Sequence, residues 1–251
     1  MAEQIKTAYG LVEGVDCGNY TVFRGIPYAK PPVGERRWKA PERPDPWDGV
    51  LKADTFSAKV LQSEVTPQNP YHKEFYEDPE YLRPSDEDSL YLNIWTPKGA
   101  AADAKLPVAF WIHGGGFGGG YSSEIEFDGE AFAAQGVILV TINYRCGVCG
   151  FLAHPWLDAE NEKGVSGNYG ILDQIAALTW VYENIDAFGG DPANITVFGQ
   201  SAGCMSTQVL VSSELTEGMI AKAILQSGCA CEVPALDTQS LESMEKWGEK
   251  F

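Results

Sequence analysis

One serine between two glycines has the setting of a catalytic nucleophile. Ser201 is the centre of Gly199-Gln200-Ser201-Ala202-Gly203, which follows a short apolar run with β-branched residues at Ile195–Phe198. On a tight turn between a strand and a helix, a serine hydroxyl is exposed and the flanking glycines prevent a collision across the turn. The following helix would direct its first N–H groups toward a developing oxyanion. These residues indicate covalent catalysis by Ser201 on an acyl group.

A second glycine stretch, His113–Gly120, follows the apolar run Val108–Ile112 and reads HGGGFGGG. A phosphate-binding loop is one interpretation, but the Gly-Lys-Ser/Thr ending of a P-loop is missing and no periodic helix starts directly after it. A plain turn with redundant glycines is another. The third is an oxyanion hole, because glycines without Cβ atoms let backbone N–H groups approach a ligand. The order of the two motifs along the chain favours the third interpretation.

The elements that must position these motifs alternate between strands and helices. Continuous apolar runs predict buried strands, and apolar residues at helical spacing predict helices. A β-hairpin is expected from Ala8–Gly14 and Tyr20–Arg24 across a Cys-Gly-Asn turn. The further expected strands are Leu90–Trp95, Val108–Ile112, Val137–Asn143, Ile195–Phe198 and Ala221–Leu225, and the expected helices are Gly129–Gln135, Gly170–Ile185 and Ala202–Ser212. This alternation predicts an α/β fold with a mostly parallel central sheet flanked by helices.

Length and charge limit the possible functions. The chain has 251 residues, 44% of them apolar, and a formal net charge of −17. Such a surface repels nucleic acids and anionic membranes, so neither is an expected partner. No apolar run has the length of a transmembrane helix, and the start MAEQIKTAYG lacks the apolar segment of a signal peptide. If Met1 is the native start, we expect a cytoplasmic protein.

Six cysteines allow two interpretations. Cys146 and Cys149 form a C-x-x-C sequence, Cys229 and Cys231 form a C-x-C sequence, and Cys17 and Cys204 stand alone. Four thiolates could bind zinc. The alternative, which we favour, is that reduced thiols serve as small apolar residues, because the two pairs lie far apart in the sequence.

The acidic segment, residues 61–88, has no clear periodicity. It contains eight acidic residues against one lysine and one arginine. Segments of this length without regular structure are often functional or mobile, and a solvated surface insertion is an equal alternative.

The sequence resembles the type-B carboxylesterase family, which includes cholinesterases and bacterial p-nitrobenzyl-type esterases. The matching segments are FRGIPYAKPPVGERRW, EDSLYLNIWTP, WIHGGGFGGG, NYRCGVCGFL, GNYGILDQIAALTWVYENIDAFGGDPANITVFGQSAG and ILQSG. The resemblance implies an α/β-hydrolase fold and hydrolysis of small-molecule carboxylic esters without a metal or organic cofactor. It also implies that Ser201 is the nucleophile and that the N–H groups of Gly115, Gly116 and Ala202 form the oxyanion hole.

The family holds two structural ion pairs, which map here to Arg37 with Glu87 and to Arg145 with Asp173. We expect each guanidinium to lie within hydrogen-bonding distance of its carboxylate.

Two departures from the family concern the surroundings of the site. Secreted relatives close the acidic segment with a disulfide, whereas the two positions here are Val60 and Ser89. This replacement fits a reducing compartment and predicts a segment that is freer to move. The residue before the nucleophile is usually glutamate and is Gln200 here, which predicts a weaker preference for cationic substrates.

The third departure is an incomplete catalytic triad, because no histidine follows Ser201. His72, His113 and His154 all precede it, and family chains place the acid and the histidine beyond the point where this chain stops. We expect a structural role for His113 and a packing or surface role for His154. Later glutamates such as Glu232 are weak candidates for the acid.

We therefore interpret residues 1–251 as the N-terminal part of a single α/β-hydrolase domain, incomplete at its C-terminus. The acid and the histidine would come from a missing C-terminal part, from a complementary polypeptide or through self-association. The alternative is an inactive hydrolase-like binding or interaction module.

Overall fold

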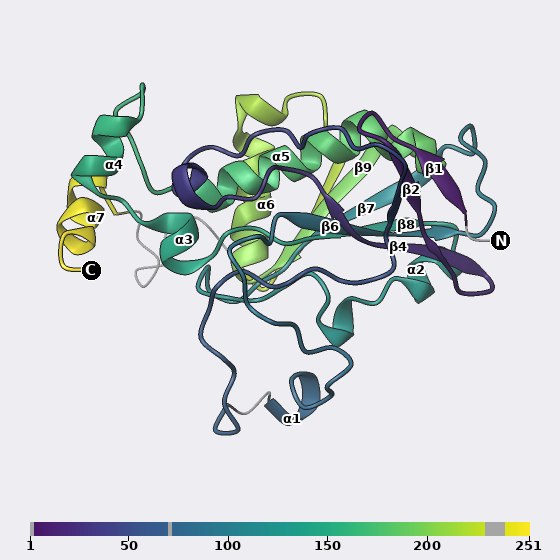
Figure 1. Ribbon diagram of the computed structural model, residues 1–251, viewed down its shortest axis with the longest axis horizontal. Helices are drawn as coiled ribbons and strands as arrows, with labels where there is room; N and C mark the ends of the chain where they lie inside the picture. Colours follow the sequence, from purple (N-terminus) through teal and green to yellow (C-terminus); the bar gives the residue numbers. More distant parts are fainter. Residues whose placement is uncertain (1–2, 70–71, 229–238) are drawn as a thin grey trace.

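The centre of the molecule is a seven-stranded mixed sheet. The structure, a computed structural model, describes residues 3–69, 72–228 and 239–251. The sheet strands are β3 Val15–Asp16, β4 Tyr20–Pro27, β6 Tyr91–Pro97, β7 Leu106–Ile112, β8 Ile138–Ile142, β9 Gly190–Gln200 and β10 Lys222–Gln226. They lie in the order β10-β9-β7-β8-β6-β4-β3 (Figure 1).

Half of this sheet is parallel. Strands β8, β7, β9 and β10 run parallel to one another, whereas the β8–β6, β6–β4 and β4–β3 pairings are antiparallel. The mostly parallel arrangement expected from the sequence therefore holds for one half of the sheet. This half contains β7 and β9, the strands that precede the two glycine motifs. Strands β3 and β4 are joined by the turn at Cys17–Asn19, which leaves no length for the crossover that a parallel pair needs.

Helices cover both faces of the sheet. The α-helices are α1 His72–Phe75, α2 Glu130–Ala134, α3 Gly147–Phe151, α4 Pro155–Glu160, α5 Tyr169–Asn184, α6 Ala202–Ser212 and α7 Leu241–Gly248. Short 3-10 helices are η1 Gly34–Arg36, η2 Ile125–Phe127, η3 Ile185–Phe188 and η4 Glu214–Thr216. The helices expected around residues 129–135, 170–185 and 202–212 are α2, α5 and α6.

Successive side chains of strand β7 point to opposite faces of the sheet, so the strand contributes to two hydrophobic clusters, one on each face. Val108, Phe110 and Ile112 face the cluster that includes α5, whereas Ala109 and Trp111 face the cluster beside α2. Because a central strand is covered on both faces, it reads as a continuous apolar run in the sequence. The carboxyl ends of β7 and β9 are thus fixed by packing on both sides.

A small second sheet corrects one expectation from the sequence. Strands β1 Gln4–Lys6, β2 Leu11–Glu13 and β5 Val50–Lys52 form it, with β2 in the centre. The sequence predicts a hairpin between Ala8–Gly14 and Tyr20–Arg24, and its first strand is wrong. The partner of β4 is β3, whereas β2 pairs with β1 in the small sheet. Gly14 separates β2 from β3, and a Cβ there would lie 2.8 Å from Phe23 and Thr21 side-chain atoms.

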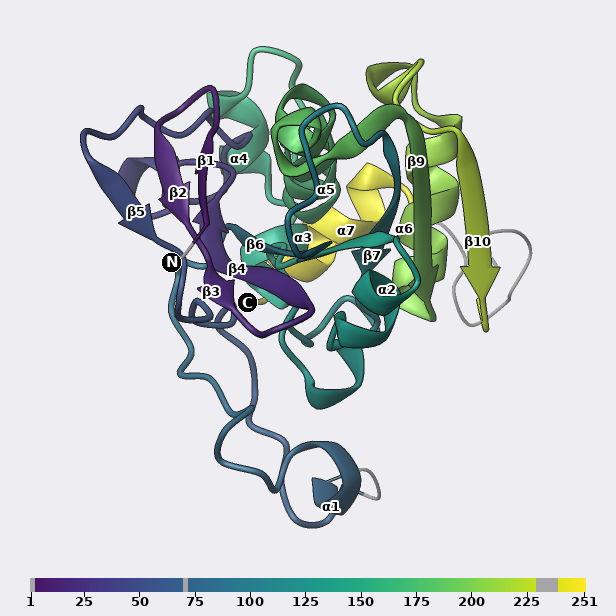
Figure 2. The same ribbon diagram turned by 90° about the vertical axis from the view of Figure 1, so that its right-hand side faces the viewer.

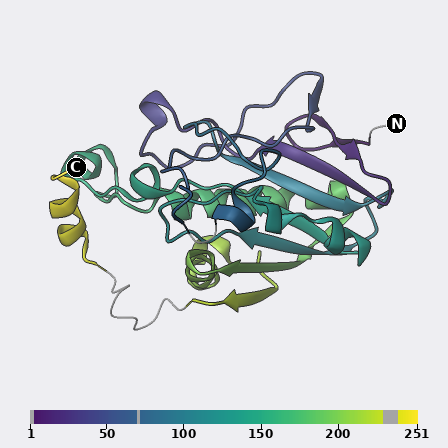
Figure 3. The same cartoon turned by 90° about the horizontal axis from the view of Figure 1, so that it is seen from below.

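Two peripheral regions extend from the body. The acidic segment with α1 projects away from the sheet (Figure 2). Helix α7 lies at the opposite end of the molecule from the N-terminus (Figure 3). Helix α7 ends at Gly248. No helix among the described residues has the length and apolar character to span a membrane.

Candidate active site

Ser201 occupies the tight turn between β9 and α6. Its backbone has φ 57° and ψ −120°, a conformation that side-chain-bearing residues rarely adopt. The Ser201 N–H donates to the Gln226 carbonyl at 3.0 Å, which extends the β9–β10 pairing to the serine. Helix α6 begins at the next residue. A strained turn of this kind has the form of a nucleophile elbow.

The two glycines of the elbow allow it to close against the neighbouring strand. A Cβ on Gly203 would overlap the carbonyl oxygen of Ile112, the last residue of β7. A Cβ on Gly199 would lie 2.5 Å from the backbone of Gly203 and 2.7 Å from the same carbonyl. These neighbours are backbone atoms, so they cannot yield without moving the strand or the helix. The Gly-x-Ser-x-Gly spacing is therefore a packing requirement here.

The glycine-rich loop lies beside the elbow because its strand pairs with β9. Ile112 is opposite Gly199 in the parallel β7–β9 pairing, so the two turns leave the sheet at the same edge. A Cβ built on Gly114 would lie only 3.4 Å from the Cβ of Ser201. The structure thus brings together two motifs that are separated by 78 residues in the sequence.

Gly115 and Gly116 present uncommitted N–H groups. Both residues are exposed, with φ values of 102° and 61° that favour glycine. Neither N–H donates to an acceptor in the described part of the chain. Ala202 is the first residue of α6, so its N–H has no acceptor within the helix. This set of donors near Ser201 is suited to stabilising a negatively charged oxygen.

His113 is buried behind the loop. Its Nδ1 lies 2.8 Å from the Gly114 carbonyl, and its ring stacks on Tyr144 with centroids 4.3 Å apart. Burial lowers the pKa of His113 to about 4, although the hydrogen bond to Gly114 acts in the opposite direction. Because a general base must accept a proton, this environment is unsuited to base catalysis. A role in supporting the loop fits the geometry better.

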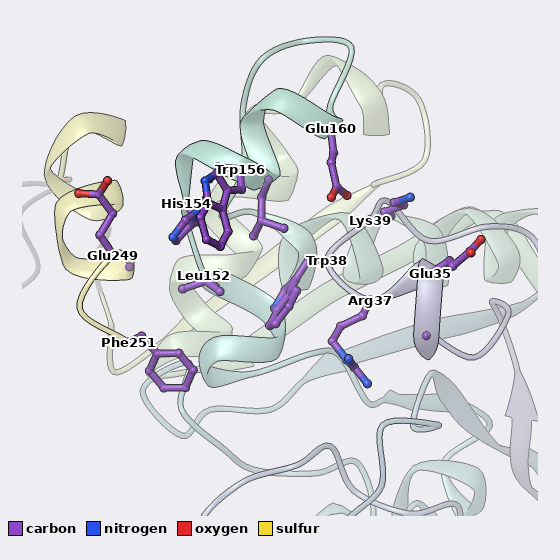
Figure 4. Close-up of a pocket in the computed structure, with 13 residues that line it drawn as sticks. Glu35, Arg37, Trp38, Lys39, Leu152, His154, Trp156, Glu160, Glu249 and Phe251 are labelled. Atoms are coloured by element: carbon purple, nitrogen blue, oxygen red, sulfur yellow. Dashed lines mark hydrogen bonds between the residues drawn. The ribbon is translucent and has the colours of Figure 1, made fainter.

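His154 lines a different cavity (Figure 4). It is the N-cap residue of α4, and its Nδ1 accepts a hydrogen bond from the Trp156 N–H at 3.1 Å. The cavity, about 870 Å³, lies between the segment around Trp38, helix α4 and the end of α7, and Ser201 is not among its lining residues. His72 is the first residue of α1. Among the described residues, the Ser201 hydroxyl has no hydrogen-bond partner.

Comparison with known proteins identifies the family. The model of the carboxylesterase family matches residues 1–251. The chain belongs to the carboxylesterase family. The resemblance drawn from the motifs is therefore confirmed.

Individual relatives agree with this assignment. The chain is 43% identical over 240 residues to the fumonisin B1 esterase of Sphingopyxis macrogoltabida, covering 95% of this chain and 42% of that protein. It is 46% identical over 227 residues to the para-nitrobenzyl esterase of Bacillus subtilis, covering 90% of this chain and 44% of that protein. The chain thus spans less than half the length of these relatives.

Solved structures establish the fold. The carboxylesterase of Geobacillus stearothermophilus superposes with a TM-score of 0.83 and 46% identity, over 98% of this chain and 47% of that one. A PNB esterase gives a TM-score of 0.84 with 41% identity, over 99% of this chain and 47% of that one. The α/β-hydrolase fold expected from the sequence is confirmed.

The ion pair between Arg145 and Asp173 is buried in this carboxylesterase-family fold. Arg145 Nε and Nη2 each donate to the carboxylate at 2.7 Å, and the Arg145 N–H donates at 3.0 Å. The side chains are only 3% and 0% exposed. Burial lowers the pKa of Arg145, but the charge and hydrogen bonds of Asp173 outweigh it, so the pKa stands above its ordinary value. The pair joins the loop after β8 to α5.

The ion pair between Arg37 and Glu87 lies at the surface. Arg37 Nε and Nη2 donate to the two carboxylate oxygens at 2.5 and 2.6 Å. The hydrogen bond from Arg37 lowers the pKa of Glu87. This pair anchors the end of the acidic segment to the segment after η1.

The described cysteines form no cluster. Cys17, Cys146, Cys149 and Cys204 are free thiols. Burial raises the pKa of Cys149 and, more strongly, that of Cys146. No three metal-ligating side chains come together in residues 3–69, 72–228 and 239–251. Cys229, Cys231 and Glu232 lie outside the described residues.

Glu124 is a buried carboxyl that no sequence motif marks. It is 7% exposed, and the Tyr76 hydroxyl donates to its Oε1 at 3.1 Å. Burial, with a smaller contribution from the charge of Glu126, raises the pKa of Glu124 to about 7. Lys59, which is 4% exposed, acts weakly in the opposite direction. Glu124 thus joins the acidic segment to the residues after the glycine-rich loop.

Replacing Glu124 with glutamine is expected to stabilise the chain at pH 8 more than at pH 5. The folded state binds more protons than the unfolded state between pH values of about 4.5 and 7, so stability falls as the pH rises through this window. At pH 8 the buried carboxylate costs on the order of 3 kcal/mol, and glutamine retains an acceptor for Tyr76. Urea unfolding at both pH values measures the effect. An equal change at the two pH values would contradict it.

Proposed function

We propose that this chain carries the nucleophile and the oxyanion hole of a carboxylic ester hydrolase. The observation that supports this most strongly is the left-handed backbone of Ser201 at the start of α6, beside the exposed N–H groups of Gly115 and Gly116. The substrate class is a small-molecule ester, as the names of the relatives suggest for those proteins. The reaction needs no metal or organic cofactor.

The proposed mechanism proceeds through an acyl-enzyme. Ser201 Oγ attacks the ester carbonyl while a histidine accepts its proton, and the N–H groups of Gly115, Gly116 and Ala202 stabilise the tetrahedral oxyanion. The alcohol leaves with a proton from the same histidine. Water then attacks the acyl-enzyme through a second tetrahedral intermediate and releases the acid. Without a histidine, Ser201 remains an ordinary alcohol.

The proposal includes a complementary C-terminal polypeptide that supplies the acid and the histidine. His113 is buried and His154 lines another cavity, so neither serves as the base. Residues 1–251 would then be the N-terminal part of a single hydrolase domain. Strand β10 supports a covering partner, because it lies at the sheet edge with Ile224 and Leu225 about half exposed (Figure 2).

Hydrolysis of a short-chain p-nitrophenyl ester tests this proposal. The 251-residue chain alone is expected to show little turnover. Turnover is expected after addition of the second half of a carboxylesterase, such as the part of the Bacillus subtilis para-nitrobenzyl esterase beyond the matched region. Serine-dependent turnover by the chain alone would instead indicate a base within it or supplied by self-association, and would contradict the need for a partner.

An inactive binding or interaction module is the second candidate. It is favoured by one observation, which is that no described histidine accepts a hydrogen bond from the Ser201 hydroxyl. Absence of turnover with every complementary half, together with a stable complex, would support this candidate.

A cytoplasmic location is also part of the proposal. The four described cysteines are free thiols, and Val60 and Ser89 occupy the positions that a disulfide joins in secreted relatives. Reduced thiols are typical of a reducing compartment.

Replacing Gln200 with glutamate is expected to favour cationic esters. Gln200 is exposed beside Ser201, so the substitution adds a negative charge at the site. A charge near a protein surface changes the free energy of a cation by about 1 kcal/mol, or on the order of fivefold in kcat/KM. The measurement compares a choline ester with its uncharged isostere in the assembled enzyme. Equal effects on both esters would refute the prediction.

A further inference from the structure

The glycine-rich loop is held in shape by contacts from outside it. Within the loop, the Gly118 N–H donates to the Gly115 carbonyl at 3.0 Å. On one side, the Gly147 N–H donates to the Phe117 carbonyl at 2.6 Å, and the Tyr144 hydroxyl donates to the His113 carbonyl at 3.0 Å. Because glycines restrict their own backbone weakly, such contacts must fix the direction of the free N–H groups.

On the other side, the end of the loop is held by the side chain of Gln62. The Gly120 N–H donates to Gln62 Oε1 at 2.7 Å, and Gln62 Nε2 donates back to the Gly120 carbonyl at 3.0 Å. A second bond from Nε2 to the Val60 carbonyl at 3.2 Å fixes the orientation of the amide. The Gln62 amide therefore satisfies both polar groups of one residue in the loop.

The contact between Gln62 and Gly120 affects the proposed oxyanion hole, because the residues between this contact and the hole pack directly against each other. A Cβ on Gly119 would lie 2.5 Å from Gln62 Oε1, so the amide lies against the Gly119–Gly120 backbone. A Cβ on Gly115 would overlap the carbonyl oxygen of Gly119, so that peptide lies directly against Gly115. A shift of Gly119 and Gly120 would therefore displace Gly115, one of the proposed donors.

Gln62 itself belongs to the acidic segment, whose two ends are joined to each other at its base. The Lys59 N–H donates to the Pro84 carbonyl at 3.0 Å, and the Asp86 N–H donates to the Lys59 carbonyl at 2.9 Å. Lys59 Nζ also contacts Glu64 at 2.8 Å. Gln62 lies three residues after this bridge, so its backbone is held near a fixed point while its side chain reaches the loop.

We propose that Gln62 is a positioning residue, whose amide holds Gly120 so that the N–H groups of Gly115 and Gly116 face the developing oxyanion. This role rests on the proposed ester hydrolysis. It also assigns a function to the acidic segment, which supports the site through a reciprocal pair of hydrogen bonds.

Kinetics of the assembled enzyme give the first test. Replacing Gln62 with methionine removes the two hydrogen bonds to Gly120, and the one to Val60, at similar side-chain volume. We expect kcat to fall about tenfold to a hundredfold with KM little changed, less than the 10²- to 10³-fold typical of deleting an oxyanion donor outright. The affinity for a trifluoromethyl ketone, which forms a tetrahedral adduct, should fall by a similar factor. Gln135→Met, at the exposed glutamine that caps α2 just after its last residue, is the matched control and should change neither value.

A pH-dependent variant distinguishes hydrogen bonding from general packing. A protonated carboxylic acid offers one donor and one acceptor, as the amide does, whereas a carboxylate only accepts. For Gln62→Glu, the ratio of its kcat to that of the wild-type enzyme is therefore expected to rise as the pH falls from 8 to 5. The same ratio for Gln62→Met should stay flat. A flat ratio for both variants, or a wild-type kcat for Gln62→Met, would overturn the proposal.

Hydrogen exchange of the 251-residue chain alone separates this proposal from the function on which it rests. Amides of the loop around Gly120 should exchange at least about tenfold faster in Gln62→Met, while those of β9 and α6 stay unchanged. If the assembled wild-type enzyme shows no turnover, the proposed function fails, and this exchange result still decides whether Gln62 holds the loop. Unchanged exchange in the loop would overturn the positioning role independently of activity.

Discussion

Replacing Ser201 with alanine is expected to reduce kcat of the assembled enzyme by about 10⁴- to 10⁶-fold, the loss typical of removing a serine nucleophile. The proposed reaction forms an ester bond to Ser201 Oγ, and no other hydroxyl occupies the left-handed turn at the start of α6. KM should change far less, because Oγ acts on the transition state more than on substrate binding. Initial rates with a p-nitrophenyl ester measure the effect.

Ser212→Ala is the matched control, because Ser212 is an exposed serine at the other end of the same helix. It should leave kcat close to the wild-type value. A Ser201→Ala enzyme that retains a tenth or more of the wild-type kcat would show that another group starts the reaction, and the proposed mechanism would be wrong.

Replacing Asp173 with asparagine is expected to destabilise the fold by about 3–5 kcal/mol, the range for breaking a buried ion pair by removing one partner. The substitution leaves the Arg145 guanidinium buried at 3% exposure without its compensating charge. Asparagine also has a single acceptor oxygen in place of the two that Arg145 contacts. The urea midpoint of the 251-residue chain measures the loss.

Glu87→Gln provides the matched comparison, because it makes the same chemical change at the other ion pair. Arg37 and Glu87 are 42% and 21% exposed, and surface ion pairs contribute little to stability. The urea midpoint should therefore stay close to that of the wild type. If the two substitutions lowered the urea midpoint equally, burial of the Arg145–Asp173 pair would not explain its contribution to stability.

The turn at Ser201 can be predicted from the sequence because the residues that determine its backbone are consecutive. Strand, glycine, serine, glycine and helix are consecutive, and the left-handed backbone of Ser201 follows from their spacing. The glycine-rich loop was accessible for a related reason, since it directly follows an apolar strand. That the two meet depended on the parallel order of β7 and β9, which alternation of strands and helices favours.

The supporting residues could not be found in this way. Gln62 lies 58 residues before Gly120, and Glu124 lies 48 residues after Tyr76, so neither contact leaves a local pattern in the sequence. A single glutamine in an aperiodic acidic segment looks like any solvated side chain. The hairpin error has the same origin, because alternation around Val12 does not reveal which strand it pairs with.

Mass spectrometry after treatment with a fluorophosphonate tests the central claim most directly. In the assembled enzyme, an activated Ser201 should form one phosphonyl adduct, located by fragmentation of the peptide that contains GQSAG. The 251-residue chain alone should remain unmodified, because it lacks the proposed base. An assembled enzyme that hydrolyses esters but carries its adduct on another residue, or on none, would contradict the assignment of Ser201 as the nucleophile.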